Sequence, residues 1–466
     1  MAADTADSDG ALPGRGPLRL KDRAAIAAVL AAMTLVVLDA GMTNVALPTL
    51  AISLGVSAAD AVLVITAYQA ALLMALLPCA ALGERWGGAP VFRGGVAVFL
   101  IGALLCAFSP SLSWLVAARL VQGFGGAAIM ALGVSLMRAT VSSGRLGEAV
   151  GWNALTVALA SAAAPTLGSL VIGHLHWPWL YAAAIPIGLL SLAASACLPA
   201  PASGLGRVDL TSVALHAAAF ALIVVAAELA LGSPALALVL VLSAATAFHL
   251  LVRRERPKTA PLLPLDLLSD ERFRISILAS VCCFIGQTAG MIALPFYLQH
   301  GLGQPAHMIG LFLLPWPLSV ALAAAFVNRL PSFVPGAWVC AAGAGLLALG
   351  LAMTAAWPLT PDAPYPLIAL TSICGLGFGL FQVPNNRNLF SAAKPERSGA
   401  AGGMQGTARI TGQLIGALLV SILFTLVPLG FAPRLGLGVA AAFALAAAMA
   451  SAARSTVRES QVAHAR

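Results

Sequence analysis

The sequence predicts an all-α integral membrane protein with fourteen transmembrane helices, arranged as two six-helix bundles and an inserted central helix pair. Three observations lead to this prediction. Of the 466 residues, 60% are hydrophobic and only 9% are charged, whereas soluble proteins carry about 25% charged residues. Apolar runs of about 20 residues, the length that crosses a bilayer, recur along the whole chain. Lys and Arg gather on alternate connections between these runs, as in multi-pass proteins.

Gly, Pro and charged residues punctuate the apolar runs and set the expected helix ends. The first block of helices is expected at 25–46, 58–80, 90–109, 112–135, 147–171 and 177–198. The inserted pair is expected at 209–230 and 234–252, with a tight turn, LGSPA, between them. The second block is expected at 274–299, 305–327, 335–355, 364–386, 400–427 and 434–453.

These helices divide the chain into six parts. They are an N-terminal tail (1–24), an N-terminal six-helix bundle (25–198), the inserted pair (199–252), a loop (253–273), a C-terminal six-helix bundle (274–453) and a C-terminal tail (454–466). Two equivalent bundles in one chain are typical of a transporter that rocks around a site at the bundle interface. A receptor or a membrane enzyme would not need the duplication.

The basic residues predict the orientation. Of the 25 Lys and Arg residues, 22 fall in tails or loops on the side of the N-terminus, and only Arg434 falls in a loop on the other side. The remaining two, Arg119 and Arg409, lie inside apolar runs. By the positive-inside rule, both termini are cytoplasmic in a cell (inner) membrane. An anionic lipid surface then accounts for the net charge of +8, so we expect no nucleic-acid partner. We expect a monomer.

Two charged residues of opposite sign fall inside predicted spans of the first half. Asp39 lies about 8 residues, or roughly 12 Å, below the outer end of the first helix, and Arg119 lies about 7 residues, or roughly 10 Å, below the same face. A carboxylate in hydrocarbon is costly, so such residues are functional candidates. One interpretation is a static ion pair that fixes helix packing. The other is a protonation switch, because losing the opposite charge or excluding water favours the protonated carboxyl.

Other polar or aromatic residues in the spans could line a substrate path. Gln405, Arg409 and Gln413 are spaced at i, i+4 and i+8, so they share one helix face. A polar stripe in a membrane must face protein or a water-filled cavity, so it either lines the path or binds helices together. The substrate-cavity candidates are Tyr68, Gln122, Asn153, Gln287, Trp316, Gln382, Asn385, Gln405 and Arg409. No enzyme, metal or cofactor signature is present, and we expect none of the three.

Four motifs resemble the fourteen-helix drug:proton antiporter branch of the major facilitator superfamily. The segment LDAGMTNVALP (38–48) is similar to that branch's first-helix motif, and ARLVQGFGGAA (118–128) is similar to its fourth-helix motif. The loop GERWGG (83–88) resembles the gating loop through Glu84, Arg85 and Gly87, although Gly88 and Ala89 replace expected basic residues. The fifth helix resembles the antiporter motif through Pro165 and Gly168, with Ala164 and Ser169 in place of glycines.

The resemblance implies proton-driven export of hydrophobic compounds by alternating access. Asp39 would be the proton-coupling carboxylate and Arg119 its basic partner. Exporters of multiply charged cations often carry further acids in their cavity, and few are found here, so a neutral, zwitterionic or anionic substrate also fits. A transporter for one metabolite remains an alternative, and a receptor or lipid-processing enzyme is a weaker one.

Overall fold

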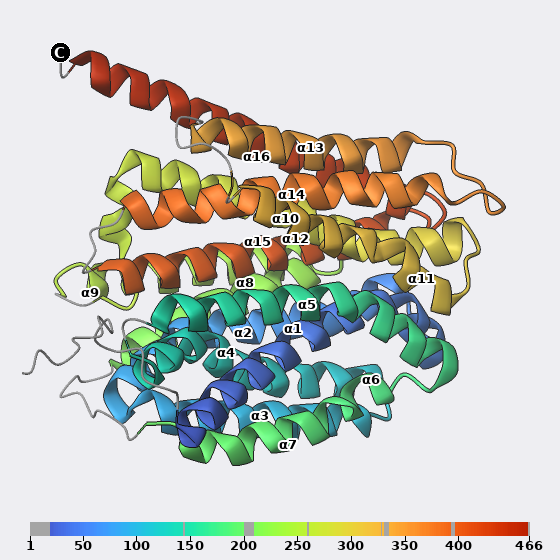
Figure 1. Cartoon of the computed structure of the whole chain (residues 1–466). Helices are drawn as coiled ribbons and strands as arrows, with labels where there is room; N and C mark the ends of the chain where they lie inside the picture. Colours follow the sequence, from blue (N-terminus) through green and yellow to red (C-terminus); the bar gives the residue numbers. More distant parts are fainter. Residues whose placement is uncertain are drawn as a thin grey trace, which may run out of the picture.

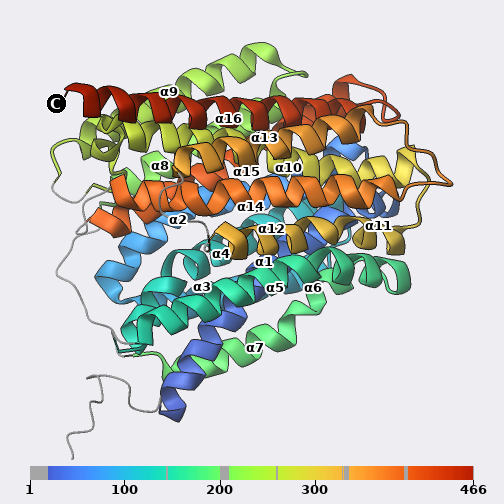
Figure 2. The same cartoon turned by 45° about the horizontal axis from the view of Figure 1, so that its top comes forward.

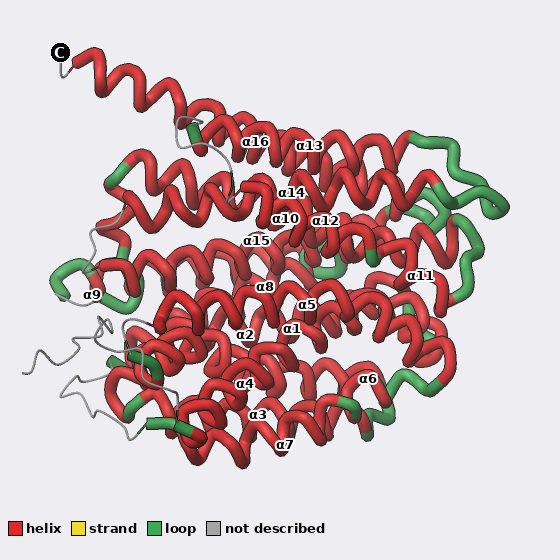
Figure 3. The backbone as a smooth tube through the Cα atoms, in the orientation of Figure 1, coloured by secondary structure: helices red, strands yellow, loops and turns green. Residues whose placement is uncertain are grey.

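The computed structural model describes residues 19–142, 145–199, 209–258, 261–327, 329, 335–392 and 397–464. These residues form long helices joined by short loops (Figure 3). Fourteen helical segments in the described part of the chain are long and apolar enough to cross a membrane, which confirms the predicted fold class. Most of the N-terminal tail, the loop at 200–208 and most of the loop at 328–334 lie outside the described residues.

Among the described residues, seven α-helices and one 3₁₀ turn form the N-terminal half. The first five spans are single helices, and the sixth is broken at Ala183 into two helices and a 3₁₀ turn. Their bounds are α1 Leu20–Leu54, α2 Ala58–Trp86, α3 Gly88–Ala107, α4 Leu112–Thr140, α5 Leu146–His174, α6 Trp179–Ala182, α7 Ala184–Ala194 and η2 Ser195–Cys197.

The C-terminal half is built in the same way. Its second span is broken before Pro315, which has no backbone N–H to continue the helix. Its helices are α10 Glu271–Phe296, which continues into a π-helical turn η4 Tyr297–Gly301, α11 Ala306–Leu313, α12 Pro315–Val327, α13 Gly336–Ala356, α14 Pro366–Ala392, α15 Ser398–Leu426 and α16 Ala432–His464. The inserted pair is α8 Leu210–Leu229 and α9 Pro234–Glu255, and a short 3₁₀ helix, η3 Leu265–Ser269, precedes α10.

Several helices extend beyond the apolar runs that predicted them. α1 begins five residues before the predicted span and ends at Leu54, where Gly55 adopts a left-handed conformation with φ of 64°. α16 continues to His464, although the sequence predicted a tail from residue 454. Hydropathy marks only the part of a helix that crosses lipid, and polar residues with good helix propensity prolong it into the interface.

The two halves lie one above the other in Figure 1, with α1 to α7 below and α10 to α16 above. In the rotated view of Figure 2, α13, α14 and α16 still lie above α3, α5 and α7, whereas α2 is drawn level with α14. Because the number of spans is even, the beginning of α1 and the end of α16 lie on one side of the bundle. We call this side the terminal face and the other side the opposite face.

Near the opposite face the halves are in close contact. α11 packs against α5 at Gly310, where an added Cβ would lie only 2.3 Å from the carbonyl oxygen of Pro165. Ser421, near the end of α15, donates a hydrogen bond of 3.3 Å to the carbonyl oxygen of Ala59 in the first turn of α2. These contacts between the halves close the interface at the opposite face in this conformation.

The inserted pair packs on the outside of the N-terminal half. His216 of α8 lies within 3.2 Å of the carbonyl oxygen of Leu73 in α2, and few side chains of α8 and α9 are buried. At the terminal face, Asp209 accepts hydrogen bonds of 2.6 Å from Arg254 and 2.8 Å from Lys258. The bonds from Arg254 and Lys258 hold the pKa of Asp209 well below its usual range. These contacts tie the start of α8 to the end of α9.

Candidate functional site

Asp39 lies in the middle of α1 and is ion-paired with Arg119 of α4. The distance from Arg119 Nη1 to Asp39 Oδ2 is 2.6 Å, and the two side chains are only 1–2% exposed. Gln122, one turn along α4, donates its Nε2 to the other carboxylate oxygen of Asp39 at 2.9 Å and accepts from Arg119 at 2.7 Å. α4 therefore presents a two-residue clamp that holds both oxygens of the carboxylate.

Arg119 is also held by α2. Its Nε donates to the carbonyl oxygen of Val64 at 3.2 Å, and its guanidinium lies 4.2 Å from the centre of the Tyr68 ring. The Tyr181 ring lies on another side, 5.5 Å away. Cation–π contacts of this kind stabilise a desolvated guanidinium. The charge pair is thus enclosed by four spans of the N-terminal half, those of α1, α2, α4 and α6, and both oxygens of the Asp39 carboxylate accept hydrogen bonds.

A cavity of about 530 Å³ lies between the two halves, a size within the usual range of small-molecule sites. Arg119 and Tyr68 form part of its wall, whereas Asp39 does not line it. The lining reaches toward the terminal face as far as Ala154 in α5 and Asn386 in α14. The carboxylate is therefore in direct contact with one residue of the cavity wall, Arg119, without lining the cavity itself.

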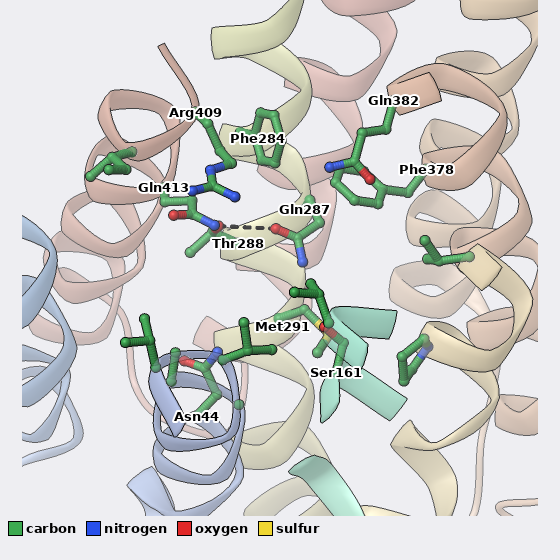
Figure 4. A pocket seen from close by; sticks show the side chains of 18 of the residues that line it. Asn44, Ser161, Phe284, Gln287, Thr288, Met291, Phe378, Gln382, Arg409 and Gln413 are labelled. Carbon is green, nitrogen blue, oxygen red and sulfur yellow. Dashed lines mark hydrogen bonds between the residues drawn. The ribbon is translucent and has the colours of Figure 1, made fainter. Parts of the chain in front are cut away.

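Five of the nine predicted cavity residues lie in this lining. They come from both halves, and Figure 4 shows Gln287, Gln382 and Arg409 around a common open space. The five are Tyr68, Gln287, Trp316, Gln382 and Arg409. The structure thus brings together on one surface residues that are separated by up to 341 positions in the sequence.

The other four predicted cavity residues lie outside the lining. Gln122 belongs to the clamp on Asp39. Asn385 donates to Ser280 Oγ at 2.7 Å within the C-terminal half. Gln405 donates to the Asn386 side chain at 3.2 Å. Asn153 lies near the start of α5, and its buried side-chain oxygen has no hydrogen-bond partner among the described residues. Three of these four amides thus bond within a half.

Several lining residues were not among the predicted ones. Thr288 and Met291, both on α10, line the cavity. The Thr288 hydroxyl donates a hydrogen bond of 3.2 Å to the side-chain oxygen of Gln287 (Figure 4). The polar or aromatic ones are Asn44, Gln69, Ser161, Phe284, Thr288, Phe378, Asn386 and Gln413. The stripe of spacing i, i+4 on α15 already contained Gln413, and Asn44 belongs to the quoted first-helix motif, so both had a signal in the sequence.

The predicted gating loop is a sharp connection between α2 and α3. Gly87 has φ of 89°, a conformation that other residues rarely adopt, and α3 begins at the next residue. Glu84 is exposed, and the Arg85 guanidinium lies 6.0 Å from the centre of the Trp86 ring. The glycine is thus required by the turn itself.

The predicted fifth-helix motif lies where α5 meets both α1 and the C-terminal half. Pro165 lines the cavity, and its carbonyl oxygen faces Gly310 of α11. An added Cβ on Gly168 would lie 2.9 Å from the backbone of Met42 in α1. The motif therefore joins the helix of Asp39 to the contact that closes the opposite face.

Two bundles of membrane spans with a cavity at their interface define a membrane transporter. The family model of the major facilitator superfamily matches residues 29–417, so the chain belongs to this superfamily. Its family and its transporter relatives identify it as a transporter and not an enzyme.

Three curated relatives are similar over most of the chain. The uncharacterized transporter YebQ of Escherichia coli is 38% identical over 405 residues, covering 86% of this chain and 88% of YebQ. The riboflavin transporter RibZ of Clostridioides difficile is 27% identical, covering 83% and 85%. The multidrug resistance protein Stp of Mycobacterium tuberculosis is 28% identical, covering 84% and 73%.

A solved structure has the same fold. The structure of the POT family transporter PepTSo superposes with a TM-score of 0.70 at 17% identity, covering 96% of this chain and 99% of that one.

Proposed function

We propose that the protein is a proton-coupled secondary transporter that exports drugs or other hydrophobic or toxic small molecules by alternating access. In this proposal it resides in the cell membrane with both termini in the cytoplasm and works as a monomer. The terminal face is then the cytoplasmic face. The cavity between the halves holds the substrate, and Asp39 carries the proton.

The buried pair of Asp39 and Arg119 carries the proposal. A desolvated ion pair is a weak source of stability, because the cost of desolvation offsets much of the attraction between the charges. Here the pair lies directly behind the cavity wall, and Arg119 belongs to both the pair and the wall. A change in the cavity that moves Arg119 would therefore alter the balance between the ionised and the protonated carboxyl.

The conformation supports the direction of coupling. With the opposite face closed, an ionised Asp39 corresponds to a state that has released its proton on the terminal face. An exporter driven by an inward proton gradient needs this state to collect its substrate from the cytoplasm. When the halves rock and the opposite face opens, protonation of Asp39 from outside would accompany substrate release.

Everted membrane vesicles with an imposed pH gradient test the proposal. Addition of ethidium, norfloxacin, tetracycline, riboflavin and naphthalene-2-sulfonate, one at a time, is expected to dissipate the gradient for at least one compound. The Asp39→Asn variant should abolish this response. The matched control is Asp22→Asn, which removes a carboxylate from the first turn of the same helix. Equal dissipation of the pH gradient in vesicles with the wild-type protein and with Asp39→Asn would exclude proton coupling at this residue.

Transport of a single metabolite is the second candidate. The observation that favours it is the riboflavin transporter among the relatives, at 27% identity. Cells lacking the protein would then accumulate one metabolite or require it for growth. Under the first proposal, the same cells would instead become sensitive to several unrelated drugs or dyes.

A further inference from the structure

The charge in the cavity wall is unbalanced. Among the described lining residues there are two cations, Arg119 and Arg409, and no Asp or Glu. Arg119 is neutralised by Asp39 at 2.6 Å. Arg409 has no hydrogen bond or ion pair to any described residue, and its Nε is buried without a partner. The cavity therefore presents one net positive charge that the described protein leaves uncompensated.

An unpaired guanidinium within a membrane span is costly, so it is unexpected unless a ligand or water satisfies it. A guanidinium has five N–H donors in a planar fork, which can bind two oxygens of a carboxylate, sulfonate or phosphonate at once. Figure 4 shows the side chain of Arg409 extending from α15 toward the open space of the cavity. The donor set is thus available at the position where a substrate would lie.

The neighbours of Arg409 are suited to an anion with an apolar body. Gln413 lies one turn further along α15, and Gln287 and Thr288 face the same space from α10 (Figure 4). Amide and hydroxyl groups can bond the remaining oxygens of an oxyanion. The wall beyond them is apolar and aromatic and includes Phe284 and Trp316.

We infer that the cavity selects amphiphilic organic anions, with Arg409 as the residue that binds the anionic group and the aromatic wall as the surface for the ring system. This inference rests on the proposed transport function of the same cavity and names its substrate class. An organic cation of similar shape would meet an uncompensated positive charge and no carboxylate in the described lining.

Binding to the purified full-length protein in nanodiscs tests the inference without involving protons or transport. Three probes share the naphthalene ring system and differ in charge: naphthalene-2-sulfonate, naphthalene-2-sulfonamide and (2-naphthyl)trimethylammonium. Equilibrium dialysis at pH 7 should give the sulfonate at least tenfold tighter binding than the sulfonamide, and the ammonium the weakest binding. A sulfonate that binds no tighter than the sulfonamide in the wild-type protein would overturn the inference.

Variants locate the anion site. Arg409→Gln should weaken sulfonate binding about tenfold or more and leave sulfonamide binding within about twofold. Arg409→Lys keeps the charge and loses the fork, so an intermediate loss is expected. The matched control, Arg256→Gln, removes the same charge from an exposed position after α9 and should leave both affinities unchanged. Equal loss of sulfonate affinity in Arg256→Gln and Arg409→Gln would refute the assignment to Arg409.

The two proposals fail in different ways. Vesicles that show no proton coupling, together with retained sulfonate selectivity in nanodiscs, would refute the proposed coupling and leave the anion site standing. Proton-coupled transport of cationic dyes, together with an absence of sulfonate selectivity, would refute the anion site and leave the coupling standing.

Discussion

Substitution of Gly310 by alanine should shift the protein away from the conformation described here. An added Cβ would lie 2.3 Å from the carbonyl oxygen of Pro165 and 2.2 Å from the hydroxyl oxygen of Ser169. Ordinary contacts of a Cβ lie at 3.4–4 Å, so α11 and α5 would have to separate by about 1 Å. Because one obstructing atom belongs to the backbone, a side-chain rotation cannot relieve the clash.

The size of the effect follows from the cost of overpacking, which is about 1–3 kcal/mol for an extra methyl group in a well-packed contact. Alanine also favours a helix over glycine by about 1 kcal/mol, but this gain is common to both conformations and cancels. A differential cost of about 1–3 kcal/mol corresponds to a roughly 5- to 150-fold change in the ratio of the two conformations. The conformation with an open opposite face should therefore gain population.

Double electron–electron resonance between two spin labels at the opposite face would measure the ratio of the two conformations. Labels at Leu175, after α5, and Tyr365, before α14, are exposed and belong to different halves. The background should lack the seven native cysteines, which are all free. Gly310→Ala should increase the long-distance population. The matched control, Gly345→Ala, adds a Cβ with no atom within 4 Å and should leave the distribution unchanged. Identical distributions for the wild type and Gly310→Ala would refute the proposed closing contact.

Two further predictions concern charge pairs. Arg119→Ala leaves Asp39 buried without its cation and should lower the free energy of unfolding by about 3–5 kcal/mol, seen as a lower unfolding temperature in detergent. Adding Asp39→Asn to this variant should recover part of the lost stability. A double variant as unstable as Arg119→Ala alone would contradict the coupling between the two residues. Asp209→Asn should lower the unfolding temperature by at most a few degrees, because exposed pairs contribute about 0–1 kcal/mol. The pKa of Asp209 is lowered by Arg254 and Lys258, so the carboxylate stabilises the fold above about pH 4, and this stabilisation is lost as the pH falls through the pKa of Asp209 in the folded protein. If the gap in unfolding temperature between the wild type and Asp209→Asn widened on acidification, this pH dependence would be contradicted.

The fold was predictable because the lipid bilayer restricts which amino acids a membrane span can contain. Each span must satisfy its backbone internally and face hydrocarbon with apolar side chains, so the number of spans follows from hydropathy alone. The breaks in two spans were harder to foresee. Pro315 marks one of them, but prolines inside α1, α2 and α5 leave those helices continuous. Neighbouring helices decide which prolines interrupt a span.

The cavity was only partly predictable, because sequence gives the depth of a residue and its helix face but not the neighbour that the face meets. Gln382 and Asn385 lie three positions apart on α14, yet the first lines the cavity and the second bonds Ser280 on α10. Gln405 and Arg409 share one face of α15, yet of the two only Arg409 lines the cavity, whereas Gln405 donates to the side chain of Asn386. The rotation and offset of packed helices determine these outcomes.

The central claim is that Asp39 couples the proton gradient to movement of the two halves. Reconstituted vesicles can separate coupling from movement by comparing gradient-driven accumulation of a labelled substrate with exchange of labelled for unlabelled substrate. Asp39→Asn is expected to abolish accumulation and to retain exchange. Accumulation by Asp39→Asn at the wild-type level would contradict the account.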